Sequence, residues 1–321
     1  DAAPRARGRR ERPTDLDRAA FWVVLNPEGP NGHTLFADSE NNGPCGRALV
    51  EELIPALESK FPLIATPEAR LLRGHSSGGW STLWLALQYP QTFGAAWSTS
   101  PDPVDFRKFQ LVNIYEDENF FQSKDKDGVA VELPSFRRTS RDSGESRAIM
   151  TVRRECRQED KVGADNSSGQ QYDSWCAVAG PRNERGHPAA LFDPVTGAID
   201  HAVTEKYRAY DIGEIVRKQP QKYLPILKDR VRLICGDADS FYLNEAVRLF
   251  VHDVAKLDGQ EIATTASIGV AHCPDDGTDF DTLLQKADTA LYRAKDAGRN
   301  GYRFFDEQMN QQVVERLQLN N

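Results

Sequence analysis

The stretch LLRGHSSGGW at residues 71–80 constrains the fold of this chain more than any other part of the sequence. A short apolar approach leads into the pattern G-x-S-x-G, and apolar residues at helical spacing begin directly after it, at Trp80. That order predicts a strand, a tight turn and a helix, with Ser76 forced onto the strained turn and its Oγ exposed as a nucleophile. We expect Gly74 and Gly78 to lie where the strand and helix backbones pass too close for a Cβ. The alternative is a Gly/Ser-rich turn without chemistry, which the flanking elements disfavour.

The composition limits which classes of protein this chain can belong to. Its 321 residues are enough for one large or two ordinary domains, each with a real core. The apolar fraction of 39% and the charged fraction of 27% are those of a globular protein. A net charge of −8 and a pI near 5.4 argue against a nucleic-acid partner. No apolar run approaches the length of a membrane span, so no membrane partner is expected either.

The five cysteines give no sign of a metal site. They are scattered without C-x-x-C spacing, which makes zinc an unexpected ligand, and we expect no cofactor. Free buried thiols are the favoured interpretation, and a Cys156–Cys176 bridge is the alternative. The positions are Cys45, Cys156, Cys176, Cys235 and Cys273.

The sequence before the G-x-S-x-G pattern predicts an arm, one strand and one helix. Residues 1–20 are rich in arginine among Pro, Gly and Ala, which indicates a disordered arm, with nucleic-acid contact as a weaker alternative. Residues 21–25 form a compact apolar run stopped by Asn-Pro, and this predicts a buried strand. Residues 48–61 have helical periodicity, and Pro55 is expected to kink that helix.

Strand and helix patterns alternate through the next thirty or so residues. A strand is expected at 70–73, a helix that ends near Tyr89, and a further strand at 93–98. This rhythm predicts an α/β fold whose parallel sheet has helices on both faces.

A long excursion with weak periodicity is predicted from about 104 to 210. Such an excursion inside an α/β frame is typical of a cap or lid over a site. A helix at 211–227 and a strand at 231–235 then return the chain to the sheet. Four aromatic residues of the excursion either line a pocket or pin it to the sheet, and we favour pinning: Tyr172, Trp175, Tyr207 and Tyr210.

The pattern changes again beyond Glu245. An amphipathic helix over 280–297 is the strongest signal in this part, and Gly298 is expected to end it. The other elements expected here are a helix at 246–257, strands at 262–271 and 302–305, and a helical tail.

A nucleophilic serine needs a base and an acid, and the sequence offers candidates for both. A histidine must take the serine proton, and a carboxylate must fix that imidazole. In an elbow of this type the partners follow in the order serine, acid, histidine. Asp239 lies just past a strand end and is the favoured acid, with Asp237 as the fallback. His272 is the histidine whose position after Asp239 fits that order.

The oxyanion of an acyl intermediate also needs donors. The backbone N–H of Ser77 is the expected first donor, and a loop after an early strand should supply the second. Only the predicted strand at 21–25 precedes the elbow, so that second donor has no evident source.

Residues 21–250 resemble the putative esterase family of α/β hydrolases. The resemblance rests on LVEELIPALESKFPL, on GHSSGGWSTLWLALQYPQTFGAAWSTSPDPVDF and on ICGDADSFYLNEAV. It implies a truncated α/β-hydrolase sheet with a cap-like insert at 104–210, Ser76 as nucleophile and Asp239 as acid. The family's N-terminal strands, oxyanion loop and final histidine segment have no counterpart.

Residues 251–321 resemble the C-terminal half of a GGDEF domain, the diguanylate cyclase fold. The carrier is TTASIGVAHCPDDGTDFDTLLQKADTALYRAKDAGRNGYRFF. The resemblance implies that Lys295 and Arg299 contact nucleotide phosphates, with GTP or cyclic di-GMP as weak candidate ligands. The GG[DE]EF hairpin and the metal-binding acidic residues are absent, so this segment is not expected to make cyclic di-GMP.

The two resemblances lead to three functional hypotheses. The first is a serine esterase acting on a small ester, impaired because its oxyanion loop and native histidine segment are missing. The second is a nucleotide-signalling remnant without cyclase activity, and the third is a non-functional chimeric fusion joined near 245–255. The esterase half suggests an exported protein and the GGDEF half a cytoplasmic one, so the location stays open.

Overall fold

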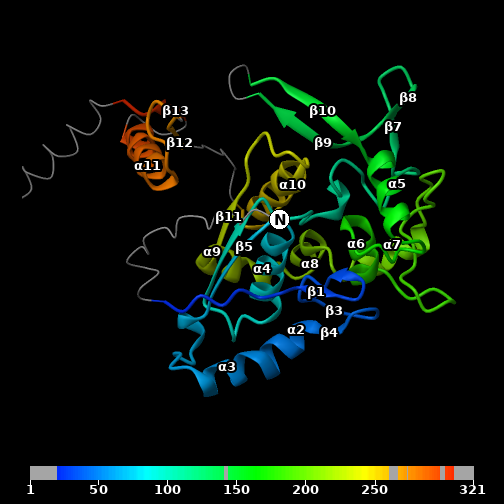
Figure 1. Ribbon diagram of the computed structural model, residues 1–321, viewed down its shortest axis with the longest axis horizontal. Coiled ribbons are helices and arrows are strands. Elements are labelled where there is room, and N and C mark those ends of the chain that lie inside the picture. Colours follow the sequence, from blue (N-terminus) through cyan, green and yellow to red (C-terminus); the bar gives the residue numbers. More distant parts are fainter. Residues whose placement is uncertain (1–19, 141–143, 260–266, 273, 297–300, 307–321) are drawn as a thin grey trace, which may run out of the picture. The chain divides into compact units, whose positions relative to one another are not determined.

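A computed structural model describes residues 20–140, 144–259, 267–272, 274–296 and 301–306. The chain forms two compact units, Asp1–Gln260 and Glu261–Asn321, and each is treated by itself (Figure 1). The expected arm at 1–20 lies, apart from residue 20, outside the described residues, as does the expected helical tail. The boundary between the units follows the helix α10 (Leu243–Leu257) instead of falling inside it.

A three-stranded parallel sheet organises the first unit, in the order β11–β6–β5. The strands are β5 (Leu71–His75), β6 (Ala95–Thr99) and β11 (Val231–Ile234). Leu71 pairs with Ala95, and Val231 pairs with Ala96. The three strands expected at 70–73, 93–98 and 231–235 and their parallel arrangement are confirmed.

Helices cover one face of this sheet only, so the expectation of helices on both faces is corrected within the described part of the unit. The helix α4 (Ser77–Gln88) packs on β5 and β6, and α9 (Pro220–Arg230) leads into β11. On the other face Leu71, Trp97 and Ile234 are 58%, 42% and 58% exposed. The strand order explains why one face is uncovered. Each successive strand, from β5 to β6 to β11, is added at the same edge of the sheet. Right-handed crossovers then place successive helices on the same face, and the opposite face is reached only where the order reverses.

The apolar run at 21–25 is not a strand, and that prediction is wrong. Phe21, Trp22 and Val23 are exposed, and Val24 is 94% exposed. Among the described residues no strand pairs with this run, and an isolated extended segment cannot satisfy its backbone groups except by water. Leu25 alone packs inward, against a small cluster that contains Leu49 and Phe93.

The helix expected at 48–61 is confirmed, with an unusual first half. It runs as α2 (Cys45–Arg47), the π-helical segment η1 (Ala48–Leu53) and α3 (Ile54–Lys60), which form one continuous helix in Figure 1. A proline lacks an N–H and its ring clashes with the carbonyl four residues earlier in an α-helix. The wide π turns directly before Pro55 fit that requirement. The remaining short elements before β5 are β1 (Glu28–Gly29), β2 (Gly32–His33), β3 (Asp38–Ser39), β4 (Gly43–Pro44) and the 3₁₀ turn η2 (Pro67–Ala69).

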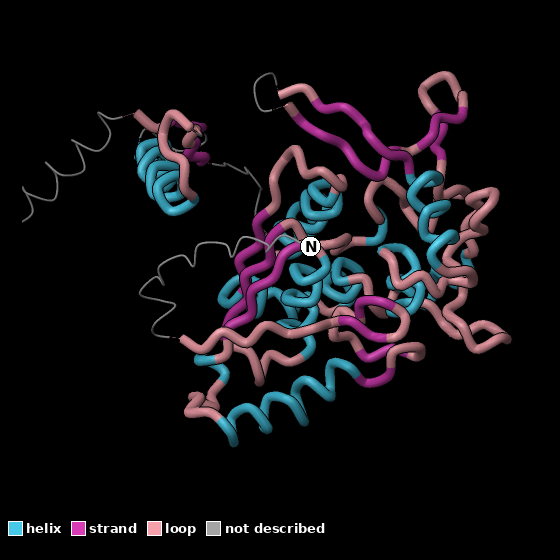
Figure 2. The backbone as a smooth tube through the Cα atoms, in the orientation of Figure 1, coloured by secondary structure: helices cyan, strands magenta, loops and turns pink. Residues whose placement is uncertain are grey.

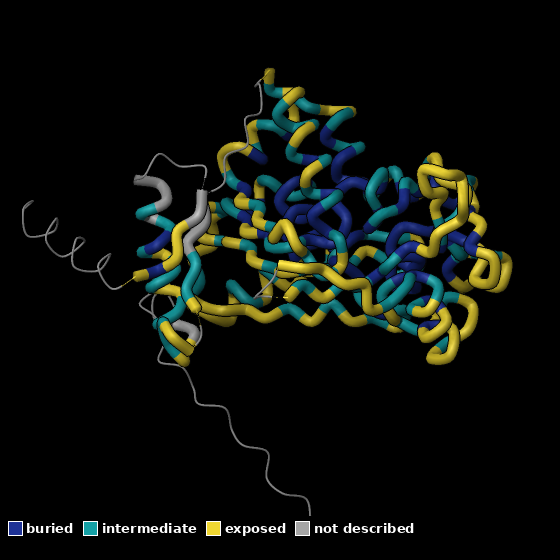
Figure 3. Tube along the Cα trace, turned by 90° about the horizontal axis from the view of Figure 1, so that it is seen from above, coloured by how far each residue is buried: buried dark blue, intermediate teal, exposed yellow. Residues whose placement is uncertain are grey.

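In its described residues the excursion at 104–210 contains two antiparallel hairpins, three α-helices and one 3₁₀ turn; Figure 2 shows their arrangement. Its elements are η3 (Phe106–Lys108), β7 (Gln122–Lys124), β8 (Ala130–Glu132), β9 (Pro134–Thr139), β10 (Ser146–Thr151), α5 (Val152–Val162), α6 (Gln171–Ala179) and α7 (His201–Tyr207). Its aromatic side chains belong to the same buried cluster as α4, so the excursion shares the core of the unit. Figure 3 shows buried segments of the chain gathered together, with exposed segments around them.

The four aromatic residues singled out in the excursion divide between the two expected roles. Tyr207 is fully buried, and the ring of Tyr210 stacks on Trp84 of α4 at 5.7 Å, so these two pin the excursion. Tyr172 and Trp175 are also buried but line a cavity, which is described below.

The segment after the excursion breaks where proline requires it. In place of one helix at 211–227 there are α8 (Ile212–Lys218) and α9, separated at Gln219. Pro220 takes the first position of α9, where a missing N–H costs nothing. The helix α10 then packs against this part of the unit, with Ala246 and Phe250 buried.

The second unit contains a strand–helix–strand crossover. The strands β12 (Ser267–Val270) and β13 (Gly301–Phe304) pair in parallel, and α11 (Phe280–Asp296) connects them. The expected strand at 262–271 is confirmed over β12, while 262–266 and Gly298 lie outside the described residues. Within the ranges that the structure describes, no helix is long and apolar enough to cross a membrane.

Candidate active site

Ser76 occupies the strained turn that the sequence predicts. Its φ of 56° and ψ of −122° place a non-glycine residue in a conformation that costs of order 1–3 kcal/mol. Three backbone hydrogen bonds hold it there. Its N–H donates to the carbonyl of Thr99 at 3.0 Å, and its own carbonyl accepts from the N–H groups of Trp80 at 3.0 Å and Asp102 at 3.1 Å. The turn is therefore held by helix α4, which follows it, and by strand β6 with the residues just beyond that strand.

Of the two glycines expected to allow a close backbone approach beside Ser76, the structure requires one, and it adds Gly79. A Cβ on Gly74 would collide with the backbone of Gly78, so the prediction for Gly74 is confirmed. A Cβ on Gly78 would meet nothing within 4 Å, and the prediction for Gly78 is wrong. Gly79 is the second close approach, because its Cβ would lie 2.8 Å from the carbonyl oxygen of Thr99.

The hydroxyl of Ser76 donates to a carboxylate that the sequence analysis missed. Its Oγ lies 3.1 Å from Oδ1 of Asp102, which is 1% exposed. The other carboxylate oxygen, Oδ2, accepts from Ser77 Oγ at 2.9 Å, Gln171 Nε2 at 2.8 Å and Trp175 Nε1 at 3.2 Å. With four donors around it, Asp102 is held rigidly as an acceptor. Its position beyond the carboxyl end of β6, next to the elbow, is the signal that could have found it.

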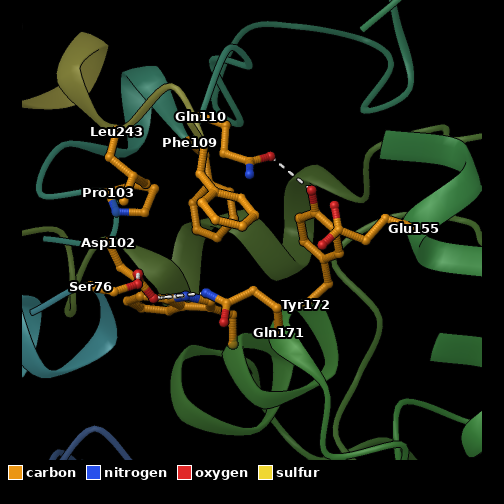
Figure 4. Close-up of a pocket in the computed structure, with 11 residues that line it drawn as sticks. Ser76, Asp102, Pro103, Phe109, Gln110, Glu155, Gln171, Tyr172 and Leu243 are labelled. Atoms are coloured by element: carbon orange, nitrogen blue, oxygen red, sulfur yellow. Dashed lines mark hydrogen bonds between the residues drawn. The ribbon is translucent and has the colours of Figure 1, made fainter. Parts of the chain in front are cut away.

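Ser76 and Asp102 lie at one end of a cavity of about 170 Å³ (Figure 4). Aromatic rings form much of its wall, and among its lining residues are two carboxylates and no basic side chain. The lining residues are Ser76, Asp102, Pro103, Phe109, Gln110, Glu155, Gln171, Tyr172, Trp175, Phe241 and Leu243. Four of these come from the excursion's helices α5 and α6, and two precede or begin α10. The excursion therefore supplies most of the cavity, although it is not a separate cap.

A second buried carboxylate, that of Glu159, fixes the start of helix α6, which lines the cavity. The carboxylate of Glu159 on α5 accepts the backbone N–H of Tyr172 at 3.1 Å and that of Asp173 at 3.0 Å. Burial raises the pKa of Glu159 to about 7, even though these hydrogen bonds lower it. The Tyr172 hydroxyl donates to Gln110 Oε1 at 2.7 Å, which fixes that ring in the wall of the cavity.

Asp239, the expected acid, caps the loop that leads into α10. Its Oδ1 accepts the backbone N–H groups of Phe241 at 2.9 Å and Leu243 at 3.1 Å, and both of these residues line the cavity. Its carbonyl accepts from Arg137 at 2.8 Å. No histidine hydrogen-bonds to it in the part of the chain that the structure describes. The fallback Asp237 forms an exposed ion pair with Arg248 at 3.0 Å.

The histidines of the first unit do not hydrogen-bond to Ser76. His75 is exposed and its Nδ1 lies 3.2 Å from Thr99 Oγ1, and His252 contacts Asp253. Both ring nitrogens of His33 are buried without a partner among the described residues. His272 belongs to the second unit, where its ring packs edge-on against Phe304 at 5.1 Å. Its role as the base stays a prediction.

The other predicted site residues are described only in part. Ser77 begins α4, so its N–H is one of the helix amides that intrahelical hydrogen bonds leave free. Lys295 lies within α11, but its side chain, like all of Arg299, is outside the described residues. Cys156 and Cys176 are free buried thiols, so the alternative bridge is not formed. In the described ranges no three His, Cys, Asp or Glu side chains are grouped so that they could hold a metal ion.

Two sequence families match different parts of this chain. Residues 37–177 match the family described as putative esterase, and residues 242–301 match the diguanylate cyclase GGDEF domain. The second match begins at α10, which the structure places in the first unit.

The curated relatives are signalling proteins much longer than this match. An uncharacterized signaling protein of Caulobacter vibrioides is 50% identical over 91 residues, which are 28% of this chain and 11% of that protein. The bifunctional diguanylate cyclase/cyclic di-GMP phosphodiesterase MucR of Pseudomonas aeruginosa is 42% identical over 82 residues, 26% of this chain and 12% of that protein. The chain thus spans about an eighth or less of these relatives.

Similar solved structures include two hydrolases. The enterobactin esterase FES from Shigella flexneri is 14% identical with a TM-score of 0.21, covering 68% of this chain and 39% of that one. The serine hydrolase FphF from Staphylococcus aureus is 13% identical with a TM-score of 0.24, covering 69% and 68%. The chain is therefore similar to the putative esterase family over residues 37–177 and to the GGDEF domain over residues 242–301.

Proposed function

We propose that the first unit is an acyl-transfer enzyme of the serine esterase type, with Ser76 as its nucleophile. The observation that carries this proposal is the strained turn of Ser76, which aims its hydroxyl at the cavity and at a buried acceptor. A structure retains such strain only where the surroundings over-determine it, and nucleophile elbows are a recurrent case.

The chemistry follows from the atoms at that end of the cavity. Ser76 Oγ attacks the carbonyl carbon of an ester while its proton passes to Asp102 Oδ1. The N–H of Ser77 faces the negative oxygen of the tetrahedral intermediate. The C–O bond to the alcohol then breaks, the alcohol leaves with the proton from Asp102, and an acyl group remains on Ser76. Water hydrolyses that acyl-enzyme and restores the hydroxyl.

Turnover by this arrangement is expected to be slow. A carboxylate is a much weaker base than an imidazole, and a serine triad acts as a unit. Reaction with activated electrophiles should therefore outpace the hydrolysis of ordinary esters. Asp239 and His272 remain the predicted acid and base of a full triad, with Asp102 as the competing candidate for the base.

Labelling with a fluorophosphonate tests this proposal, because the probe reacts with an activated serine without needing turnover. We expect the wild type to be labelled, with the tag on the peptide that contains Ser76, and Ser76→Ala to abolish labelling. Ser77→Ala is the matched control, since Ser77 also donates to Asp102 but should stay dispensable for labelling. Asp102→Asn should slow labelling about a hundredfold through loss of the proton acceptor. A folded wild type that is not labelled, or a labelled Ser76→Ala, would overturn the proposal.

The second unit supports a different candidate function, the binding of a guanine nucleotide without cyclase activity. The match to the GGDEF domain over 242–301 favours it, as do relatives that carry cyclic di-GMP enzymes in their names. Lys295 and Arg299 are the predicted phosphate contacts. Calorimetry with GTP and with cyclic di-GMP tests it, with Lys295→Ala and Arg299→Ala as variants, and flat traces for the wild type would remove it.

The third candidate, a chimeric fusion with little activity, makes its own prediction. It is favoured by the presence of matches to two different families in one chain, over residues 37–177 and 242–301. Sequencing independent clones across 245–255 tests it, since an artefactual join would not be reproduced.

A further inference from the structure

The cavity has a second end that the proposed chemistry does not use. Glu155, on the first turn of α5, lies there, and Figure 4 places it across Tyr172 and Phe109 from Ser76. Its Oε2 is buried and has no hydrogen-bond partner among the described residues. Ser135 is fully buried and lies beside this carboxyl group, where its hydroxyl lowers the pKa of Glu155. Buried polar atoms without partners are rare in folded proteins and mark places where a ligand or water completes the structure.

The charges around this end favour a cation. Asp102 and Glu155 are the charged residues among those that line the cavity, and both are acidic. The basic residues of α5 do not line this cavity. Arg153 pairs with Glu132 at 2.7 Å, and Arg154, Arg157 and Lys161 line a different hollow of about 240 Å³.

The walls between the two ends are suited to a cation with an alkyl stem. Phe109, Tyr172 and Trp175 present aromatic surface along the cavity. A cation near such faces gains about 0.5–2 kcal/mol, more where water is excluded. Rotation about the last bond of the Glu155 side chain is soft and can turn Oε2 toward the cavity.

We propose that the Glu155 end of this cavity binds a primary ammonium group, so that the site selects esters whose acyl or alcohol part carries an amine several bonds from the carbonyl. The ester part of this statement rests on the proposed function, and the ammonium part does not. Burial raises the pKa of Glu155, and an ammonium ion beside it would reverse that rise, so ligand and carboxylate stabilise each other's charge.

Binding of simple amines tests the proposal without any turnover. The wild-type full chain is titrated with n-pentylammonium and, separately, with n-pentanol, which has the same stem and no charge. The perturbation of tryptophan fluorescence reports occupancy, because Trp175 lines the cavity. We expect the ammonium to bind at least about tenfold more tightly than the alcohol.

Two variants distinguish a direct contact between Glu155 and the ammonium group from a general effect of negative charge on α5. Glu155→Gln keeps the shape and should abolish the preference for the ammonium. Asp160→Asn removes one negative charge from the exposed side of the same helix, does not line the cavity, and should leave the preference intact. Equal binding of amine and alcohol by the wild type overturns the proposal even if Glu155→Gln does not fold. A preference that survives in folded Glu155→Gln also overturns it. Because these readouts need no reaction at Ser76, a failure of fluorophosphonate labelling would leave them unaffected.

Discussion

The two ends of the cavity hold the same chemical group in opposite states. At one end the carboxylate of Asp102 is buried and accepts hydrogen bonds from four side chains. At the other end Glu155 is half-buried, and its Oε2 has no hydrogen-bond partner in the described structure. Two of these donors, Gln171 and Trp175, come from successive turns of α6, and both donate to Asp102. The number of hydrogen-bond donors around a carboxylate therefore determines whether it can still accept a ligand, and burial alone does not.

The largest expected effect comes from removing the saturated carboxylate. Asp102→Ala leaves the side-chain donors of Ser77, Gln171 and Trp175 without their acceptor. Each buried unsatisfied group costs about 1–3 kcal/mol, so we expect the free energy of unfolding to fall by about 3 kcal/mol or more. Urea denaturation measures it.

Asp237→Ala is the control for this experiment. Asp237 forms an exposed pair with Arg248, and such pairs contribute about 0–1 kcal/mol. If the two variants lost equal stability, the contrast between a saturated and a surface carboxylate would be broken.

Glu159 is an intermediate case, buried but bonded to backbone amides, and it predicts a pH dependence. Its pKa in the folded protein is about 7, above the ordinary 4.5, so folding favours its protonated form. The stabilisation is fully present below pH 4.5 and is lost as pH rises through 7, a change of about 3 kcal/mol.

The pH dependence is measured as the difference between two denaturation series. Other buried acids such as Asp211, whose pKa is raised to about 6, also contribute to the wild-type curve. Subtracting the curve of Glu159→Gln isolates the Glu159 contribution. A difference that is flat between pH 4.5 and 7 would contradict the prediction.

The smallest expected effect is on stability at the unsatisfied end. At pH 7 a half-buried carboxylate with one unpartnered oxygen lowers stability, so Glu155→Gln should keep or gain stability, by no more than about 1 kcal/mol. Thermal melts of both proteins without ligand measure it. A loss of more than about 1 kcal/mol would mean that this oxygen is engaged after all, and the comparison of the two ends would need revision.

The parts of the fold that the sequence predicted are those with a local cause. The elbow at Ser76 is set by its own glycines and by the strand and helix beside it, and β6 and β11 are short apolar runs with clear ends. The exposed run at 21–25 has the same local pattern, but a strand also needs a partner, and its own residues do not reveal whether one exists.

The parts of the site that the sequence did not predict depend on distant contacts. Asp102 becomes an acceptor only because α6, about seventy residues later in the sequence, brings Gln171 and Trp175 to it. Glu155 lies in a stretch so rich in charged residues that the sequence does not reveal which residues of α5 form its buried face. That face runs through Val152, Cys156 and Glu159, and one of its three members is itself a charged residue.

The helix α10 has a consequence for how this chain can be divided. Its sequence is matched by the GGDEF domain from residue 242, yet Phe250 is buried in the first unit and Asp253 pairs with Arg107 at 2.5 Å and Arg217 at 3.4 Å. A truncation placed where the GGDEF match begins, at residue 242, would remove that helix and expose the part of the first unit's core that it covers. A truncation after Gln260 would keep it. The boundary of the sequence match and the boundary of the folded unit therefore lie at different residues. A shortened protein should end after α10, where the folded unit ends.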